Sequence, residues 1–195
     1  MGKRVVVVAS GATEQKALPH LCRHLSGDDV QLLKVVTPPG HKQIRPALAT
    51  QLIRAAWFGW AHAGGADKFV VLLDADAHDP EVVAGPVREA CGGMQDIPVP
   101  ICVTAAQRHL EAWFFADPVG LRRHLSNRAL GNIRDAPDQM ENPKQHLRNL
   151  LAPDFYTSLR AGAIAADLDP AAIEDRSPSF KRLAAAMRNG LPPRA

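Results

Sequence analysis

Cysteines and long apolar runs are both scarce in this sequence. Its 195 residues include three cysteines, which are Cys22, Cys91 and Cys102. They are odd in number and too widely spaced for a zinc knuckle, so we expect reduced thiols, as in a cytoplasmic protein. The first apolar run, Val5 to Ala9, is too short for a signal peptide or a membrane span. We therefore expect neither a disulfide-stapled nor a membrane protein.

The motifs of two common enzyme classes are missing as well. Gly11-Ala12-Thr13-Glu14 lacks the lysine that an ATP-binding P-loop requires. Ser10 lacks the G-x-S-x-G context of a serine hydrolase. The net charge of +3 permits nucleic-acid binding without demanding it, because only clustered cations would be diagnostic.

Short apolar runs alternate with helical patterns over the first part of the chain. The runs predict strands at 4–10, 30–36, 69–73 and 98–103. Apolar residues at helical spacing predict helices at about 13–27, 45–63 and 80–91, with Thr13 as the cap of the first, and another from about residue 104 to 117. Trp57, Trp60 and Trp113 are interpreted as core residues. This alternation predicts an α/β fold with a mainly parallel sheet flanked by helices.

The strand pattern stops at about residue 126. Cap-plus-proline pairs at Asn142-Pro143, Asp169-Pro170 and Ser177-Pro178 predict short helices instead. We therefore predict an α/β domain over 1–125 and a helical C-terminal extension over 126–195 packed on it. The cations of this extension are scattered, which favours a solvated face, with a nucleic-acid track as the alternative; they are Lys144, Arg148, Arg160, Lys181, Arg182 and Arg188.

A pair of aspartates follows the most apolar run of the chain. Asp74 and Asp76 come directly after Phe69 to Leu73, at the end of a parallel strand where open α/β sheets bind ligands. Two carboxylates roughly 5 Å apart repel by about 3 kcal/mol at an effective dielectric of about 20. A divalent cation with oxygen ligands would relieve that repulsion. The alternative is a helix cap plus a loop aspartate, since Asp79-Pro80 also looks like a helix start.

Two glutamates follow other predicted strands. Glu14 comes after the first strand and Glu111 after the fourth. Because the carboxyl ends of parallel strands share one edge, these side chains can converge with Asp74 and Asp76. Acidic groups that converge on Mg²⁺ form a phosphoryl-transfer centre.

Three segments resemble the signatures of a Toprim-like bacterial family of uncharacterised proteins. They are Gly11-x-Thr13-Glu14, Leu73-Asp74-Ala75-Asp76 and Leu110-Glu111-Ala112-Trp113-Phe114. That family is similar to the Toprim nuclease half of OLD-family enzymes and to RloB-type proteins, and it is often encoded beside an AAA/SMC-type ATPase. The resemblance covers residues 4–117 by motif and, more loosely, the tail through Tyr156 and Ser177-Pro178-Ser179-Phe180. It implies a Toprim-like, Rossmann-like domain, Mg²⁺ or Mn²⁺ binding, and cleavage of DNA or RNA, commonly in phage defence.

The resemblance also suggests roles for single residues. Asp74 and Asp76 are the expected metal ligands, Glu14 a ligand or general base, and Glu111 a group that serves a second metal or supports the ligands. From side-chain chemistry alone, His78 is a candidate for ligating a metal or positioning water, and Arg108 and His109 are candidates for contacting phosphate. A loop histidine without a role is an equal alternative for His78.

Ser10 departs from the family pattern. Such proteins usually have Glu-Gly-x-Thr-Glu after the first strand, whereas this sequence has Ser10-Gly11-Ala12-Thr13-Glu14. A hydroxyl is a poorer ligand for a hard cation than a carboxylate, and it is a negligible base at neutral pH. The sequence therefore leaves open a catalytically degenerate subunit that docks on an ATPase, and a small-molecule phosphatase or phosphotransferase.

Overall fold

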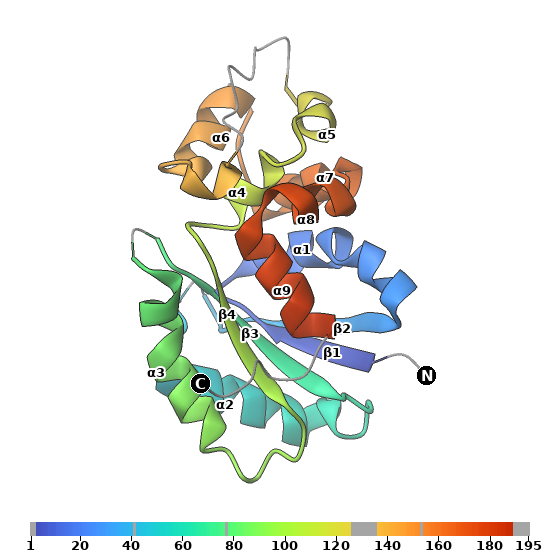
Figure 1. Cartoon of the computed structure of the whole chain (residues 1–195), viewed down its shortest axis with the longest axis vertical. Helices are drawn as coiled ribbons and strands as arrows, with labels where there is room; N and C mark the ends of the chain where they lie inside the picture. Colours follow the sequence, from blue (N-terminus) through green and yellow to red (C-terminus); the bar gives the residue numbers. More distant parts are fainter. Residues whose placement is uncertain (1–2, 41, 77, 126–135, 153, 189–195) are drawn as a thin grey trace.

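The chain folds around a small parallel β-sheet. The computed structural model describes residues 3–40, 42–76, 78–125, 136–152 and 154–188 (Figure 1). Within these residues the sheet has four strands in the order β2-β1-β3-β4, and neighbouring strands are parallel. The strands are β1 (Lys3–Val8), β2 (Val30–Val36), β3 (Lys68–Asp74) and β4 (Ile101–Ala106). Helices flank the sheet, so the predicted α/β class with a Rossmann-like parallel sheet is confirmed.

Burial explains why these apolar runs form strands. β1 and β3 lie in the middle of the sheet, and the side chains of Val5–Val8 are buried alternately in the cores on its two faces. β2 lies at an edge and exposes Gln31 and Lys34. An unbroken apolar sequence is typical of a strand covered on both faces, and a mixed one of an edge strand.

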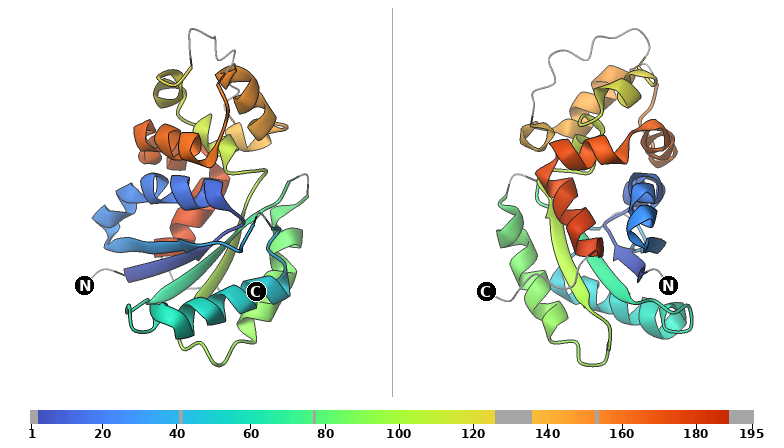
Figure 2. Two further views of the ribbon diagram at one scale, coloured as in Figure 1. Left: turned by 180° about the vertical axis from the view of Figure 1, so that it is seen from behind. Right: turned by 45° about the vertical axis from the view of Figure 1, so that its right-hand side comes forward.

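Helices cover the two faces of the sheet in separate groups (Figure 1 and Figure 2). On one face lie α2 (Pro46–Ala56) and α3 (Pro80–Gly92). On the other face lie α1 (Ala12–Leu21) and α9 (Pro178–Arg188), with α7 (Ser158–Asp167) packed against α1. α9 therefore covers β3 and β4 on the same side of the sheet as α1.

The C-terminal helices share a hydrophobic core with the α/β part. Buried Leu21, Trp113, Ile164 and Phe180 all belong to one cluster. The remaining helical segments are η1 (Arg23–Asp28), η2 (Trp57–Ala61), α4 (Glu111–Phe114), α5 (Pro118–Arg122), η3 (Pro137–Gln139), α6 (Pro143–Leu151) and α8 (Pro170–Arg176). The described residues after 126 contain no strand, as expected. The predicted boundary at residue 126 falls in 126–135, which lies outside the described residues.

Several predicted element bounds were wrong. β4 begins at Ile101 and continues to Ala106, because Pro98 and Pro100 have no N–H for the sheet while 104–106 pair with the end of β3. The helix expected over 104–117 is therefore only the short α4. Thr13 does not cap α1, whose N-cap is Gly11.

Other sequence-based expectations agree with the structure. The Asp117 and Asp169 side chains accept N–H groups at the starts of α5 and α8. Trp57 and Trp113 are buried, and Trp60 is partly buried under the Lys34 ammonium. The cysteines are free and buried. None of the helices among the described residues combines the length and apolar character that a membrane crossing requires.

Candidate functional site

A pocket lies where the sheet changes its direction of winding. From β1 the chain passes through α1 to β2 on one side, whereas β3 lies on the other side of β1 and leads into α3 on the opposite face. The carboxyl ends of β1 and β3 therefore flank the crevice in which open α/β sheets bind ligands. A pocket of about 320 Å³ is found there, lined by Ser10, Glu14, Gln43, Ile44, Leu73, Asp74, Asp76, Val83, His109, Glu111 and Lys144.

The two aspartates reach this pocket in different ways. Asp74 is the last residue of β3, and its Oδ2 accepts a hydrogen bond from Ser10 Oγ at 3.4 Å. Asp76 lies beyond the strand with a left-handed backbone (φ 51°). Its N–H donates to the Arg108 carbonyl at 3.2 Å, and Arg108 Nη1 donates to its carbonyl at 3.1 Å. A tight turn held by Arg108, rather than a continued strand, brings Asp76 to the pocket.

Buried glutamates surround Asp74. Glu14 lies in the first turn of α1 and Glu111 begins α4, and the two residues are only 5% and 3% exposed. Burial raises the pKa of Asp74 to about 8, and the charges of Glu14, Glu111 and Asp76 add to that rise, while the Ser10 hydrogen bond opposes it. The pocket therefore concentrates negative charge in a poorly solvated place.

This rise in pKa makes the metal-free protein sensitive to pH. Asp74 has an ordinary pKa of 3.8 in the unfolded chain and one of about 8 in the folded chain, so the folded state binds the proton more tightly. Stability should fall as the pH rises from about 4 to about 8, by on the order of a few kcal/mol. Asp74→Asn should lose much of this dependence and be more stable than wild type at pH 8. Urea unfolding of wild type and Asp74→Asn in EDTA at pH 5 and pH 8 measures the pH dependence and the stability difference. Equal pH dependence in the two proteins would contradict the attribution of this dependence to Asp74.

Three further side chains contact the acidic groups of the pocket. Lys144 Nζ, at the start of α6, lies 3.9 Å from Glu111 Oε1. The Tyr156 hydroxyl donates to the same oxygen at 3.0 Å, and burial together with the Glu111 charge raises the pKa of this tyrosine. His109 Nε2 lies 3.3 Å from Asp76 Oδ1. Glu111 is thus held by a cation and a hydroxyl, and Asp76 by an imidazole.

Sequence reasoning missed Lys144 and Tyr156 as site residues. Lys144 was grouped with the solvated cations, yet its place in the first turn of α6 was a signal, because the helix dipole disfavours a cation there unless a partner compensates. Tyr156 is the only tyrosine of the chain and had no informative spacing. Gln43, Ile44 and Val83 also line the pocket without any sequence signal.

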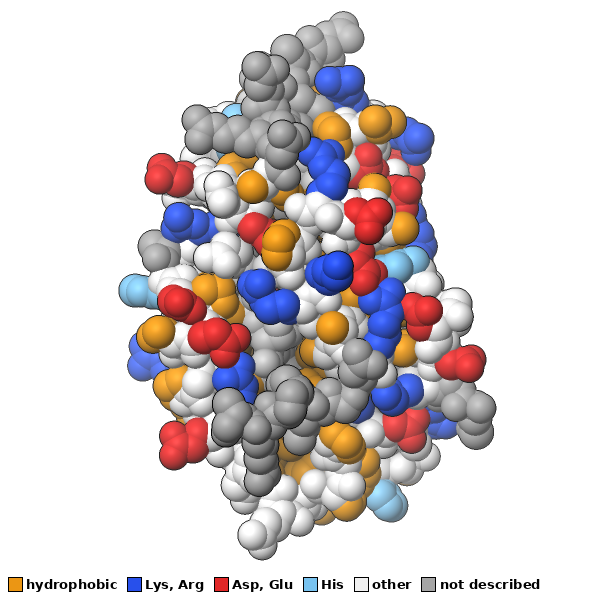
Figure 3. Space-filling view, in the orientation of Figure 1, with side chains coloured by type: hydrophobic (Ala, Val, Ile, Leu, Met, Phe, Trp, Pro, Cys, Tyr) orange, Lys and Arg blue, Asp and Glu red, His pale blue; other side chains and the backbone are white. Residues whose placement is uncertain are grey.

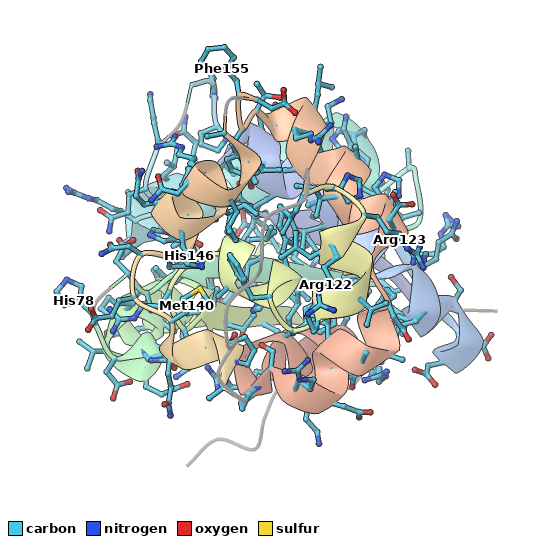
Figure 4. The ribbon with its side chains drawn as sticks, turned by 90° about the horizontal axis from the view of Figure 1, so that it is seen from above. His78, Arg122, Arg123, Met140, His146 and Phe155 are labelled. Carbon is cyan, nitrogen blue, oxygen red and sulfur yellow. The ribbon has the colours of Figure 1, made fainter. Side chains whose placement is uncertain are left out.

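The structure brings most of the predicted site residues together, but not all. Ser10, Glu14, Asp74, Asp76, His109 and Glu111 line the pocket. Arg108 uses its guanidinium to hold the backbone of Asp76. His78 is exposed, and Figure 4 shows it at the edge of the molecule, away from the body of the chain. Neither Arg108 nor His78 is among the residues that line the pocket.

The donor chemistry of the pocket suits a hard divalent cation. Carboxylate oxygens are the ligands that Mg²⁺ and Mn²⁺ prefer, and a cation beside Asp74 would relieve the repulsion that raises its pKa. Within the described residues, however, no three His, Cys, Asp or Glu side chains are close enough to hold one ion together. The chemistry fits, while a preassembled ligand cluster is not formed.

The residues of the pocket fall within a region that matches a known protein family. A protein-family model described as a domain of unknown function (DUF4276) matches residues 10–188 of the chain. The chain belongs to the DUF4276 family. The matched DUF4276 region takes in every residue that lines the pocket together with α6 to α9. The pocket and the C-terminal helices that contribute to it are therefore parts of one family region.

The other two comparisons gave no relatives of the DUF4276 chain. No curated protein matches it. No solved structure matches it either.

Proposed function

We propose that this DUF4276 protein hydrolyses phosphodiester bonds of DNA or RNA with Mg²⁺ or Mn²⁺, on a Toprim-like domain, in phage defence or nucleic-acid processing. The observation that carries the proposal is the group of acidic side chains at the crevice between β1 and β3. Glu14, Asp74 and Glu111 converge there at the point where an α/β sheet binds ligands. The motifs that resemble Toprim-like proteins supply these same residues.

The charged residues of the pocket and the hydroxyl groups that contact them each have a part in this proposal. Asp74 and Asp76, with Glu14, would hold the cation once their side chains draw closer together than they are among the described residues. A bound divalent cation lowers the pKa of an attacking water and stabilises the leaving oxygen. Ser10 and Tyr156 orient Asp74 and Glu111 by their hydrogen bonds. Lys144 offsets part of the negative charge that would otherwise repel a phosphate, and His109 contacts Asp76.

A catalytically degenerate subunit that docks on an AAA/SMC-type ATPase is the second candidate. Ser10 stands where the Toprim-like proteins that these motifs resemble usually have a glutamate, and the described residues do not form a ready ligand cluster. Both observations favour a site that has lost part of its metal-binding capacity.

A small-molecule phosphatase or phosphotransferase is the third candidate function, because a pocket of about 320 Å³ lies within the size range of small-ligand sites.

Incubation with nucleic acid separates these candidates. The purified protein, alone and with the product of any neighbouring ATPase gene, is incubated with supercoiled plasmid and with RNA in Mn²⁺ or EDTA. A hydrolase should nick the plasmid or shorten the RNA in Mn²⁺ only. Stable co-purification with the ATPase and no cleavage under any condition would favour the docking subunit. Release of phosphate from p-nitrophenyl phosphate without cleavage of nucleic acid would favour the phosphatase.

A further inference from the structure

Two cations lie on one side of α6 next to the acidic pocket. Lys144 and Arg148 are four residues apart, so they lie on the same face of this helix. Lys144 reaches Glu111 in the pocket, and Arg148 is exposed and acts electrostatically on the Tyr156 hydroxyl. The positive charge therefore continues outward from the pocket along α6.

An exposed aromatic side chain follows in the segment between α6 and α7. Phe155 is 88% exposed, more than any other large hydrophobic residue described. Its neighbour Tyr156 turns inward and binds Glu111, whereas Figure 4 shows Phe155 at the edge of the molecule, pointing outward. Cα atoms of adjacent residues are about 3.8 Å apart, so Phe155 lies close to Tyr156, which binds a glutamate of the pocket.

Other cations of the C-terminal helices are already engaged or are mixed with acids. Arg188 pairs with Asp28 and Glu174, and Arg176 of α8 donates to the Ala116 carbonyl. On the face shown in Figure 3, Lys and Arg side chains are interspersed with Asp and Glu. We therefore assign these cations to solvated or structural surface, as the sequence predicted. Lys144 and Arg148 differ from them, because Lys144 lines the acidic pocket and Arg148 lies on the same face of α6.

We propose that Lys144, Arg148 and Phe155 form a short track that guides single-stranded nucleic acid into the pocket. The choice of a nucleic acid rests on the proposed function. Cations that follow the backbone and an exposed ring on which a base stacks are the two elements of single-strand binding sites. A duplex keeps its bases stacked on each other and offers Phe155 no free base face.

The burial of the acidic groups also favours a single strand. Glu14 and Glu111 are almost fully buried, so a phosphate must enter a recess of about 320 Å³ to approach them. A flexible strand can bend one phosphate into this recess. A duplex is stiff over about 150 base pairs and presents its phosphates on a broad cylinder.

Fluorescence anisotropy with a labelled oligothymidylate of about ten nucleotides tests the track, in Ca²⁺ and in EDTA. We expect tighter binding of the single strand than of an oligothymidylate–oligoadenylate duplex of the same length. Phe155→Ala should weaken binding about tenfold, because one stacked base is lost. Phe58→Ala is the matched control, since Phe58 is 67% exposed but lies in η2, which continues α2 on the other face of the sheet.

The charge of the track gives a second readout. Arg148→Gln should lower the slope of log affinity against log salt by about 0.7, the loss of one phosphate contact with a single strand. Arg182→Gln, an exposed cation on α9, should leave the slope unchanged. Both variants change exposed side chains, and their melting temperatures serve as the check on folding.

Binding and cleavage separate failure of the track from failure of the proposed hydrolase. Binding that depends on Phe155 without cleavage would support the track and contradict the hydrolase. Cleavage with unchanged affinity in Phe155→Ala would contradict the track alone. Absence of single-strand binding in both buffers, or duplex binding as tight as single-strand binding, would also overturn the track.

Discussion

Asp74→Asn is expected to lower Mn²⁺-dependent nicking of supercoiled plasmid about a thousandfold, since metal assistance is worth several kcal/mol in the transition state. Asp74 is the residue on which the other acidic groups converge. Its carboxylate accepts from Ser10 and is influenced by Glu14, Asp76 and Glu111. An amide of the same size keeps the hydrogen bond from Ser10 but removes the charge that would hold a cation. Initial rates of nicking in wild type and variant measure the change.

Asp169→Asn is the matched control for this prediction. Asp169 caps α8 from the surface, and asparagine caps a helix equally well. This variant should nick at the wild-type rate. Equal loss in both variants, or retention of nicking in Asp74→Asn, would contradict a catalytic role for the pocket.

Asp138→Ala is expected to cause the largest loss of stability among the described polar residues, about 4 kcal/mol. Asp138 lies in η3 and is 6% exposed. Its carboxylate accepts from Ser177 Oγ at 2.7 Å and from Ser179 N and Oγ at 2.7 and 2.9 Å. Ser179 Oγ also accepts from Trp113 Nε1 at 2.7 Å. Removing the carboxylate leaves buried donors without their acceptor.

The effect of Asp138→Ala should extend to the pocket. Trp113 lies in α4, the helix that begins with Glu111, so the network joins the site to the start of α9. Urea unfolding measures the loss, with Asp175→Ala on the exposed side of α8 as the control. A change below about 1 kcal/mol would show that the network contributes little, because surface substitutions reach only about half of that.

The parts of the fold that depend on local pattern could be predicted from the sequence. Unbroken apolar runs identified the strands, because a parallel strand covered on both faces has no polar side. The carboxylates after these runs were placed at one edge because parallel strands end together. Glu14, Asp74 and Glu111 do lie in one pocket, although they are far apart in the sequence.

The parts that depend on long-range packing could not be predicted. Ala105 and Ala106 have high helix propensity but continue β4, because the backbone of β3 supplies their hydrogen bonds. The strand order, which puts β1 beside β3 and so Ser10 beside Asp74, has no signature in local sequence. Lys144 and Tyr156 reach the site only because the C-terminal helices pack beside α4, and a helical pattern does not show where a helix docks.

Metal binding at the pocket is tested most directly by the melting temperature of wild type and Asp74→Asn during titration with Mg²⁺ or Mn²⁺. A cation that binds only the folded state adds about 2.7 kcal/mol at a hundred times its dissociation constant, which corresponds to roughly 5 °C or more for a chain of this size. We expect this rise in wild type and in Asp169→Asn, and little of it in Asp74→Asn. Equal rises in wild type and Asp74→Asn, or no rise in wild type, would contradict a cation site at Asp74.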